Sequence, residues 1–370
     1  MRIAMVHSTF ATSGGAERYI RDVARSLTAR GHEVRIYSRD DRSLRPRLSE
    51  RLGARLPRLL RKGLVHIGDL VDPTGPRPRD LRDFAPDVVH VHNWQRLGVL
   101  PVARISRAYP TCHTVHDHAI CDPNNALGNL GRSRVLDALL AVRAAWIVRR
   151  FRRVRLLFAA ERTRDTVRAI APQAGGLASR IVPLAVPTPW HRLPWPAGRR
   201  DAFLFLGALT RHKGIDLLLD AWRPAFGTLL VAGDGPLRPE VERRAASTPS
   251  VRYLGHLDDE GKRAAFAQAG WLVFPSRKPE TYGLACAEAL MAGRPIIAAA
   301  HARPPMATDT STLQFHDLAE LSHLLARAAR MPAGEYDRMA ASAAADGRRL
   351  DWDEHIDTLL DVYETAGPIR

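Results

Sequence analysis

Residues 275–295 read PSRKPETYGLACAEALMAGRP and follow the apolar run Trp271–Phe274. A short apolar run that is closed by Pro275 is typical of a buried parallel strand. From Gly283 the sequence is rich in helix formers, and it reaches Gly293 where a helix C-terminus is expected. The stretch therefore predicts a strand, a loop and a helix, which together form the repeating unit of an open α/β sheet.

Two glutamates in this stretch are placed to contact a ligand. Glu280 falls in the loop at the carboxyl end of the strand, where open α/β sheets bind ligands, and Glu288 falls in the helix. The backbone N–H groups of Tyr282, Gly283 and Leu284 would form a helix N-terminus suited to a phosphate. Ionised carboxylates accept hydrogen bonds from hydroxyls, so a sugar nucleotide fits both features. Two glutamates eight residues apart, taken alone, would indicate no more than a surface helix preceded by a solvated loop that contains Glu280.

The wider pattern P-S…E-x-Y-G-L…E-A-L-x-A-G-x-P, with its E-x7-E spacing, resembles the signature of retaining glycosyltransferases of the family 4 type. The resemblance implies the α/β GT-B fold, in which two facing Rossmann-like α/β/α domains have a cleft between them. It also implies transfer of a sugar from a nucleotide-diphosphate sugar to a hydroxyl acceptor with retention, in the synthesis of cell-surface glycans, polysaccharides or glycolipids. By this resemblance Glu288 would hold the ribose and Glu280 the donor hexose.

Composition limits the class of protein. The chain has 370 residues, enough for two domains, with 45% apolar and 25% charged residues, which is typical of globular proteins. No apolar run is long enough to span a membrane, and the N-terminus reads as a strand rather than a signal peptide. The three cysteines show no C-x-x-C pairing, which favours a reducing compartment. We expect a cytoplasmic protein, with possible peripheral association at the inner face of the membrane.

The N-terminal half begins with a strand pattern and a glycine loop. The first strand is followed by Gly14, Gly15, Ala16, Glu17 and Arg18, and the helical pattern after them ends at Gly31. A glycine pair alone indicates only a turn. Its resemblance to the G-G-A-E-R segment of the same family is more specific, and implies that Gly14 and Gly15 lie by the diphosphate and Glu17 on the acceptor side.

Histidines cluster at the ends of two predicted strands. The cluster consists of His90, His92, His113, His116, Asp117 and His118. Its spacing is close to, but does not match, the H-x-H-x-D-H of binuclear metal hydrolases. The His116-Asp117 pair instead matches the T-x-H-D of the transferase family, which implies that His116 is catalytic and that Asp117 and Trp94 lie on the acceptor side. A metal is not required by that resemblance.

Residues 1–183 are predicted to form the first domain, residues 184–200 a proline-dense linker, and residues 201–350 the donor-binding domain. A final helix over about residues 351–366 is expected to return to the first domain, as the resemblance implies.

The second half repeats strands that run into glycine turns. Gly207 ends one predicted strand, and Gly233 and Gly235 follow another in a loop that resembles the nucleotide-binding loop of the family. Arg211 and Lys213 lie between a strand and a helix, where cations suit a diphosphate.

The chain departs from the family at two places. Lys213 matches the pattern G-R-L-x-x-x-K-G, but Ala208 replaces its arginine, so that either Arg211 substitutes or diphosphate binding is weaker. Residues 301–312 replace a glycine-rich segment that normally positions donor or acceptor, and this difference leaves specificity, and to a lesser degree activity, open.

The formal charge of +16 calls for an anionic partner or surface. No segment reads as a nucleic-acid module. Basic residues concentrate at 45–62 and 143–155, both in the first domain. Around the second segment the helical spacing of Val135, Leu139, Val142, Trp146 and Arg150 predicts a half-buried helix with one apolar face and a cationic end. Each segment fits a solvated surface, and each also fits contact with an anionic membrane surface or a lipid-linked acceptor.

The sequence therefore predicts a glycosyltransferase whose donor is a nucleotide sugar and whose acceptor is a glycan or lipid-linked molecule, with no cofactor. Two alternatives remain open: a non-catalytic GT-B scaffold that binds glycans or lipids, and a metal-dependent hydrolase that uses the histidine cluster.

Overall fold

The computed structural model describes residues 1–10, 15–40, 57–71, 75–124, 127, 133–187 and 200–366, without the side chains of residues 58, 59, 61 and 62. The chain forms two compact units. The first unit comprises Met1–Pro183 and Asp353–Arg370, and the second comprises Leu184–Trp352. Residues 188–199 of the expected linker lie outside the described residues.

The first unit is built on a parallel sheet of six strands in the order β2-β1-β3-β4-β5-β6. Its strands are β1 (Arg2–Val6), β2 (Glu33–Tyr37), β3 (Val88–Val91), β4 (Thr111–Val115), β5 (Val154–Phe158) and β6 (Ser179–Ile181). Its helices are α1 (Gly15–Ala29), α3 (Arg58–Val71), α4 (Val99–Ala108), α5 (Arg134–Arg150), α6 (Glu161–Ile170) and α13 (Trp352–Glu364), with 3-10 turns η1 (Pro78–Leu81) and η3 (Pro172–Gly176).

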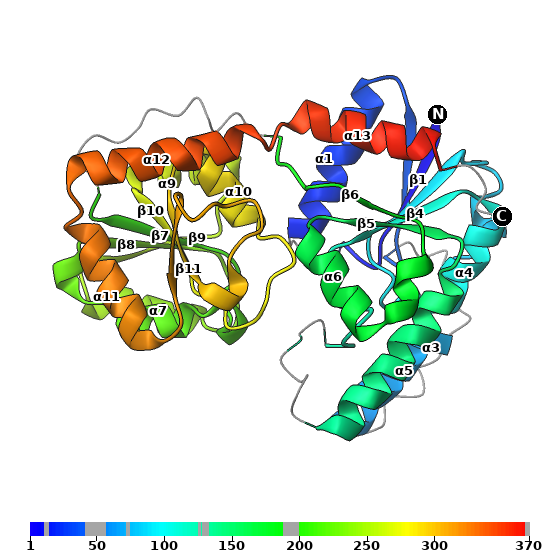
Figure 1. Cartoon of the computed structure of the whole chain (residues 1–370), viewed down its shortest axis with the longest axis horizontal. Helices are drawn as coiled ribbons and strands as arrows, with labels where there is room; N and C mark the ends of the chain where they lie inside the picture. Colours follow the sequence, from blue (N-terminus) through cyan, green and yellow to red (C-terminus); the bar gives the residue numbers. More distant parts are fainter. Residues whose placement is uncertain are drawn as a thin grey trace. The chain divides into compact units, whose positions relative to one another are not determined.

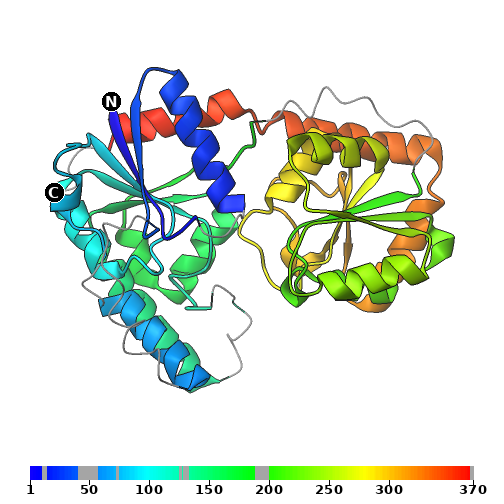
Figure 2. The ribbon, with the colours of Figure 1, turned by 180° about the vertical axis from the view of Figure 1, so that it is seen from behind.

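Alternation along the strands decides which helices cover each face of this sheet. Val89 and Val91 of β3 share a buried cluster with Val102 of α4 and Ile147 of α5. His90 lies between these valines on β3 and bonds Tyr363 of α13 on the opposite face, through Nδ1 and the hydroxyl at 2.7 Å. The sheet is therefore covered on both faces, as Figures 1 and 2 show.

The second unit repeats this architecture with the strand order β12-β11-β10-β7-β8-β9. Its strands are β7 (Ala202–Leu206), β8 (Thr228–Ala232), β9 (Val251–Gly255), β10 (Trp271–Phe274), β11 (Ile296–Ala299) and β12 (Thr312–Phe315). Its helices are α7 (Ile215–Ala221), α8 (Arg238–Ser247), α9 (Asp259–Gln268), α10 (Leu284–Met291), α11 (Leu318–Ala329) and α12 (Ala333–Arg348), with 3-10 turns η5 (Arg211–Lys213), η6 (Pro224–Phe226) and η7 (Ala300–Ala302).

The central strands of the second unit are buried along their whole length. Helices α9, α10 and α12 cover one face of the sheet, and α7 and α11 cover the other (Figure 1). Full burial explains why β10 and β11 read as continuous apolar runs rather than alternating ones. Each fully buried aliphatic or aromatic side chain contributes about 1.5–3 kcal/mol to stability. The predicted fold class, two Rossmann-like α/β/α domains, is confirmed.

The basic segment at residues 143–155 forms the last part of α5, the turn that follows it and the first two residues of β5. The apolar stripe predicted by the helical spacing of Val135, Leu139 and Val142 faces solvent, since these side chains are 62–71% exposed. The buried side of α5 instead carries Leu140, Ala144, Ile147 and Val148. The other basic segment is described only from residue 57 onward, where α3 begins at Arg58.

Candidate functional site

Three loops of the second unit leave the carboxyl ends of neighbouring parallel strands. β7 pairs with β10 on one side and with β8 on the other, all parallel. The loops that follow these strands carry the predicted glycines, cations and Glu280. Parallel pairing therefore brings segments that are far apart in the sequence to one edge of the sheet, where α/β proteins bind ligands.

Lys213 and Glu280 meet at this edge. Lys213 Nζ donates to Glu280 Oε1 at 2.7 Å, and Ser276 Oγ donates to the same oxygen at 2.6 Å. His212 Nε2 lies 3.6 Å from it. The sequence analysis identified Lys213 and Glu280 as site residues but did not predict that they contact each other. It did not identify Ser276 or His212, because the only indication of their roles is that they lie next to the other site residues in the sequence.

These neighbours change the pKa of Glu280. Burial raises the pKa, but the interactions with His212, Lys213 and Ser276 outweigh it and lower the pKa to about 2. The carboxylate therefore stays ionised at neutral pH. An ionised carboxylate has several lone-pair positions, so Glu280 can accept further hydrogen bonds from sugar hydroxyls.

Glycines let the loops approach each other closely. A Cβ on Gly214, whose φ is +73°, would lie 1.9 Å from the carbonyl oxygen of Pro275. A Cβ on Gly233 would lie 1.9 Å from the carbonyl oxygen of Gly207, and one on Gly235 would lie 2.7 Å from that of Leu209. The glycine turns predicted from the sequence therefore hold the three loops in backbone contact, which no larger residue permits.

The helix N-terminus predicted in the signature stretch is present. Gly283 has a φ of +90° and caps α10, which begins at Leu284. The Tyr282 side chain is buried, and its hydroxyl donates to the carbonyl oxygen of Leu184. Tyr282 therefore anchors the loop, while the first N–H groups of α10 remain available for an anion.

Glu288 lies one turn into α10 and is buried. Lys262 Nζ of α9 donates to its Oε1 at 2.7 Å. A buried carboxylate needs such compensation, because its desolvation would otherwise be costly. Sequence reasoning missed Lys262, since nothing in the α9 pattern distinguishes this lysine from a surface residue.

Arg211 and Lys213 occupy the 3-10 turn η5 after β7. Arg211 is exposed and has no ion-pair partner among the residues that the structure describes. Its guanidinium is therefore free to meet an anion at this edge of the sheet. Ala208, the position where the family has arginine, is also in this loop.

The segment that departs from the family contacts the signature loop. His301, in the turn η7 after β11, forms a 2.9 Å hydrogen bond through Nε2 to the carbonyl oxygen of Ser276. Further along, Thr308 and Ser311 both donate to the buried carboxylate of Asp346 on α12. The segment 301–312 is thus held by the second unit through bonds that the sequence alone did not predict.

The first unit gathers histidines at the carboxyl edge of its own sheet. His7, His92 and His116 come directly after the adjacent strands β1, β3 and β4. His92 Nδ1 and His116 Nε2 are 3.2 Å apart, and His7 Nε2 is 3.2 Å from Glu17 Oε1. The predicted His116 and Glu17 therefore lie on the same sheet edge.

Two helices support these histidines from the other side. The ring of Tyr19 of α1 contacts His116, with centroids 5.4 Å apart, and its hydroxyl bonds His355 of α13 at 2.8 Å. His90 bonds Tyr363 of α13 and Thr114, both at 2.7 Å. The sequence gave no sign of these contacts, in which His355 and Tyr363 come from the opposite end of the chain.

Electrostatics at this edge favours neutral side chains. Burial, with the nearby His113 and His7, lowers the pKa of His116 to about 3. Desolvation raises the pKa of Asp117 to about 6, although the N–H of Ala119 donates to its carboxylate. His116 is therefore a neutral imidazole at pH 7, able to donate or accept one hydrogen bond at each nitrogen.

Trp94, which the resemblance assigns to the acceptor side, is buried in the first unit. Its side chain is 1% exposed and lies in the core of the first unit, with Arg143 over the ring at 5.7 Å. Arg143 also donates to the carbonyl oxygens of Ala119 and Ile120. Trp94 therefore supports the loop after Asp117 rather than a bound molecule. Gly15 begins α1, and Gly14 lies outside the described residues.

The histidine cluster is not arranged as a ligand set. Both ring nitrogens of His90 bond protein groups, and His113 Nδ1 donates to the carbonyl oxygen of Val91 at 3.0 Å. Within the described ranges, no group of three or more His, Cys, Asp or Glu side chains is placed to hold a metal ion. His90 and His113 therefore serve the packing of the sheet.

Comparisons with known proteins agree with this architecture. Residues 13–173 match the model of Glycosyltransferase Family 4, and residues 200–328 match that of Glycosyl transferases group 1. A D-inositol 3-phosphate glycosyltransferase of Thermomonospora curvata is 27% identical over 96% of this chain and 91% of its own. The D-rhamnosyltransferase WbpZ of Pseudomonas aeruginosa is 34% identical, but over 31% of this chain and 29% of its own length.

The fold has solved counterparts. The crystal structure of Anabaena Alr3699/HepE in complex with UDP-glucose matches with a TM-score of 0.66 and 15% identity, over 99% of this chain and 100% of the other. The two family models together cover most of both units, on the segments that carry the sites described above. The chain belongs to the glycosyltransferases of the family 4 type and has their GT-B fold.

Proposed function

We propose that the enzyme transfers a sugar from a nucleotide-diphosphate sugar to a hydroxyl of a glycan or lipid-linked acceptor, with retention at the anomeric carbon. The observation that carries the proposal is the junction of Lys213 and Glu280 beside the N-terminus of α10. This junction brings together a cation, a carboxylate that accepts hydrogen bonds from hydroxyls, and free backbone N–H groups. A sugar diphosphate requires these three kinds of partner.

Each group then has a role in the donor complex. Lys213, Arg211 and the first N–H groups of α10 stabilise the negative charge that develops on the departing diphosphate. Glu280 accepts hydrogen bonds from the hexose hydroxyls, and Glu288 accepts those from the ribose. The loop with Gly233 and Gly235 holds the nucleotide base.

The first unit supplies groups for the acceptor and the reacting centre. A neutral His116 can hydrogen-bond a sugar hydroxyl without adding positive charge next to a developing oxocarbenium ion. Glu17 and Asp117 are the carboxyl groups on the same sheet edge, and we assign them to the acceptor. In this scheme the departing phosphate takes the proton of the acceptor hydroxyl, so no protein nucleophile and no metal are needed.

A thermal-shift screen with UDP-, GDP- and ADP-sugars tests the donor assignment. Saturation at a hundred times Kd stabilises the folded state by about 2.7 kcal/mol, so one nucleotide should raise Tm clearly above the others. The anomeric configuration of the product, read by proton NMR, then tests retention. A non-catalytic scaffold would bind glycans or lipids but release no nucleoside diphosphate.

Membrane location belongs to the same proposal. The relatives include a phosphatidyl-myo-inositol mannosyltransferase of Mycobacterium leprae, 28% identical over 44% of this chain. Together with the net charge of +16, this supports an enzyme that works at the cytoplasmic face of a membrane.

A further inference from the structure

A pocket lies on the first unit between α4 and the C-terminal end of α5, and it contains none of the residues assigned to the donor or the acceptor. Its volume is about 410 Å³. It is lined by Ala103, Ser106, Arg107, Trp146, Arg149, Arg150, Arg152 and Arg153. Five of these eight residues are arginines, and none is acidic.

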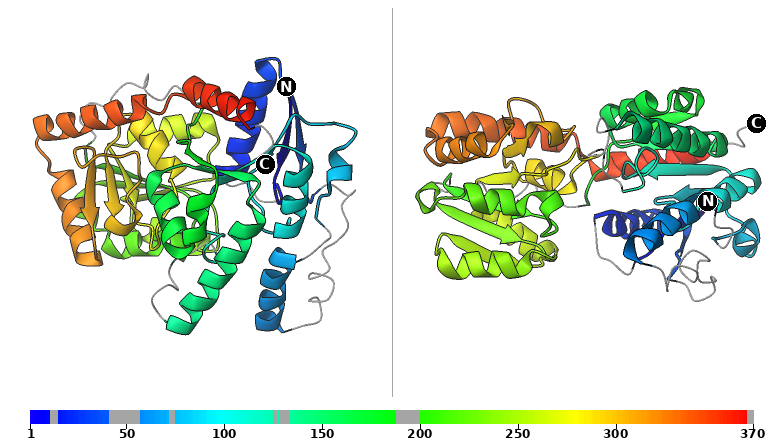
Figure 3. Two further views of the ribbon diagram at one scale, coloured as in Figure 1. Left: turned by 45° about the vertical axis from the view of Figure 1, so that its right-hand side comes forward. Right: turned by 90° about the horizontal axis from the view of Figure 1, so that it is seen from below.

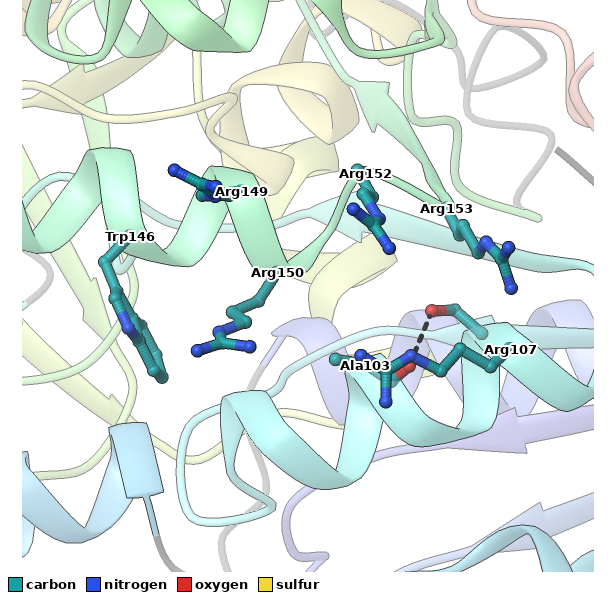
Figure 4. A pocket seen from close by; sticks show the side chains of 8 residues that line it. Ala103, Arg107, Trp146, Arg149, Arg150, Arg152 and Arg153 are labelled. Carbon is teal, nitrogen blue, oxygen red and sulfur yellow. Dashed lines mark hydrogen bonds between the residues drawn. The ribbon is translucent and has the colours of Figure 1, made fainter. Parts of the chain in front are cut away.

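Figure 4 shows how these side chains are supplied. Trp146, Arg149 and Arg150 come from the last turns of α5, while Arg152 and Arg153 follow in the turn before β5. Arg107 comes from α4. Trp146 and Arg150 point toward the α4 side of the pocket, and the Arg150 guanidinium lies 5.1 Å from the centre of the Trp146 ring.

The five arginines have no carboxylate partner within the part of the chain that the structure describes. Cations at the C-terminal end of a helix are favoured by the helix dipole, which accounts for Arg149 and Arg150 of α5 and for Arg107 in the last turn of α4. It does not account for Arg152 and Arg153, which follow α5. Five unpaired guanidiniums around one hollow repel each other. Such a cluster is best satisfied by anionic groups, and arginine binds phosphate with paired N–H groups.

The same face of α5 carries the exposed apolar stripe. Val135, Leu139, Val142 and Trp146 recur at intervals of three and four residues, so they form one line along the helix that runs into Arg149 and Arg150. The first three side chains are 71%, 62% and 69% exposed. Figures 1 and 3 show that this part of α5 projects beyond the sheet of its unit.

A second helix repeats the pattern. α3 exposes Leu60, Ile67 and Val71, at 61%, 58% and 50%, and their spacing of seven and four residues also places them on one face. α3 packs on α4 and projects from the same side of the unit as α5 (Figure 3). No helix within the described ranges is long and apolar enough to cross a bilayer. These amphipathic helices therefore suit the interface of a membrane rather than its interior.

We propose that the arginine pocket binds the phosphate of an anionic phospholipid while the apolar stripe of α5 inserts among the acyl chains beside it. The occupant follows from the combination of charges and apolar groups. Nucleic acid would satisfy the arginines but offers no apolar surface to Val135, Leu139 and Val142. A second copy of the chain would bring two five-arginine clusters together, which is unfavourable. A bilayer of anionic phospholipid supplies phosphate for the arginines and hydrocarbon for the stripe.

The proposal goes beyond the transferase reaction, and its test does not depend on activity. The full chain is sedimented with vesicles of phosphatidylcholine alone or mixed with phosphatidylglycerol, at low and high salt. Three double variants are compared: Arg150→Gln with Arg153→Gln in the pocket, Leu139→Gln with Val142→Gln on the stripe, and Arg243→Gln with Arg338→Gln on the second unit. The last pair removes the same charge from exposed positions elsewhere. All six side chains lie at or near the surface, and circular dichroism verifies folding.

We expect the wild type to bind the mixed vesicles and to be released by high salt. The pocket variant should lower the partition coefficient by about tenfold or more, since each arginine near an anionic surface contributes strongly. The stripe variant should lower it several-fold at unchanged charge, and the control variant should bind like the wild type.

Several results would overturn the proposal. Equal binding of the pocket and control variants would mean that net charge alone attracts the protein. Equal binding to vesicles with and without phosphatidylglycerol would show that the pocket does not recognise an anionic headgroup. If soluble glycerol phosphate displaced the protein from vesicles at a concentration equal to that of the vesicle phosphate, the pocket would be a site for free anions rather than for a lipid headgroup. If the wild type formed a dimer in solution and bound no vesicles, and if the stripe variant abolished that dimer, the stripe would be a contact surface for a second copy of the chain.

Discussion

At the scale of single residues, Glu280 and Lys213 satisfy each other across 2.7 Å while each keeps bonding capacity for a donor. Glu288 and Lys262 form a second buried pair eight residues further along the signature. The sequence predicted both glutamates and Lys213 because their spacing follows a known pattern. It could not predict Lys262 or His301, because a side chain that reaches a site from another helix or loop leaves no trace in local spacing.

The two glutamates should fail in different ways. Glu288→Ala removes the acceptor proposed for the ribose, so it should weaken binding of the nucleoside diphosphate, by roughly tenfold or more for a charged hydrogen bond. Glu280→Ala should lower turnover more than nucleotide affinity, since its proposed partner is the sugar. Calorimetry with the free nucleoside diphosphate measures the first effect and steady-state kinetics the second. Glu335→Ala on α12 is the control. If Glu280→Ala and Glu288→Ala both bound the nucleoside diphosphate as tightly as this control, the donor assignment would be wrong.

The cations of the η5 turn provide another test. Lys213→Ala should reduce kcat/KM by roughly 10²-fold, the scale for losing one electrostatic contact in a transition state. Arg211→Ala should also be costly if Arg211 replaces the arginine that is missing at Ala208, and Arg211→Lys should recover part of the loss. Unchanged kinetics in Arg211→Ala would show that another group meets the diphosphate.

At the scale of elements, the strands and helices that could be predicted are those whose sequence pattern fits only one type of secondary structure in one environment. β10 was predicted to the residue and α10 to within one residue at each end, because a buried parallel strand reads as an apolar run and the run of helix formers ends before a glycine. β12 was missed because it is a short edge strand with half-exposed residues. For α5 the spacing correctly indicated a helix, but periodicity cannot tell whether an apolar stripe faces the core or solvent.

Two glycines offer a matched test of loop packing in the second unit. Gly214 and Gly255 have nearly the same φ, +73° and +72°, but a Cβ at 214 would meet the Pro275 carbonyl oxygen at 1.9 Å, whereas one at 255 meets nothing within 4 Å. Gly255→Ala should cost about 1–2 kcal/mol from backbone strain alone. Gly214→Ala should cost clearly more and also weaken nucleotide binding, because it separates the loops of Lys213 and Glu280. Chemical denaturation compares them, and equal losses would contradict the close packing of these loops.

At the scale of the whole molecule, the chain repeats one α/β architecture in two units of different electrostatic character. The sequence resemblance was sufficient to predict the fold class and the family. The resemblance implied that a final helix returns to the first domain, but it could not identify Tyr363 and His355 as the side chains through which α13 bonds that unit, since their partners are distant in sequence. The first unit consequently holds neutral imidazoles in its interior.

These imidazoles predict an acid-sensitive first unit. Burial lowers the pKa of His90 and His92 well below the usual value, and lowers those of His113, His116 and His355 to about 4, 3 and 4. As pH falls below about 6.5 the unfolded chain binds protons that the folded unit does not, so stability decreases, by about 1.4 kcal/mol per pH unit for each fully active histidine. Asp117, whose pKa is raised to about 6, offsets one of these protons.

The second unit should lose stability at lower pH. The lowered pKa of Glu280 contributes stability above its usual value near 4.5, and this contribution is lost as pH falls toward 2. Scanning calorimetry between pH 8 and 4 should therefore show that the transition temperature of the first unit falls before that of the second. The variant Gly214→Ala, which destabilises the second unit, identifies which transition belongs to that unit. A first-unit midpoint that stays constant from pH 8 to 5 would contradict the neutral histidine interior.

The most direct test of the donor site is nucleoside diphosphate release by the purified chain from the sugar nucleotide that raises its Tm. The account predicts that the wild type releases the diphosphate in the presence of acceptor and that Glu280→Ala retains nucleotide binding but loses most of the release. If no UDP-, GDP- or ADP-sugar is bound or consumed by the wild type, or if Glu280→Ala turns over at the wild-type rate, the site described around Lys213, Glu280 and α10 does not hold the donor.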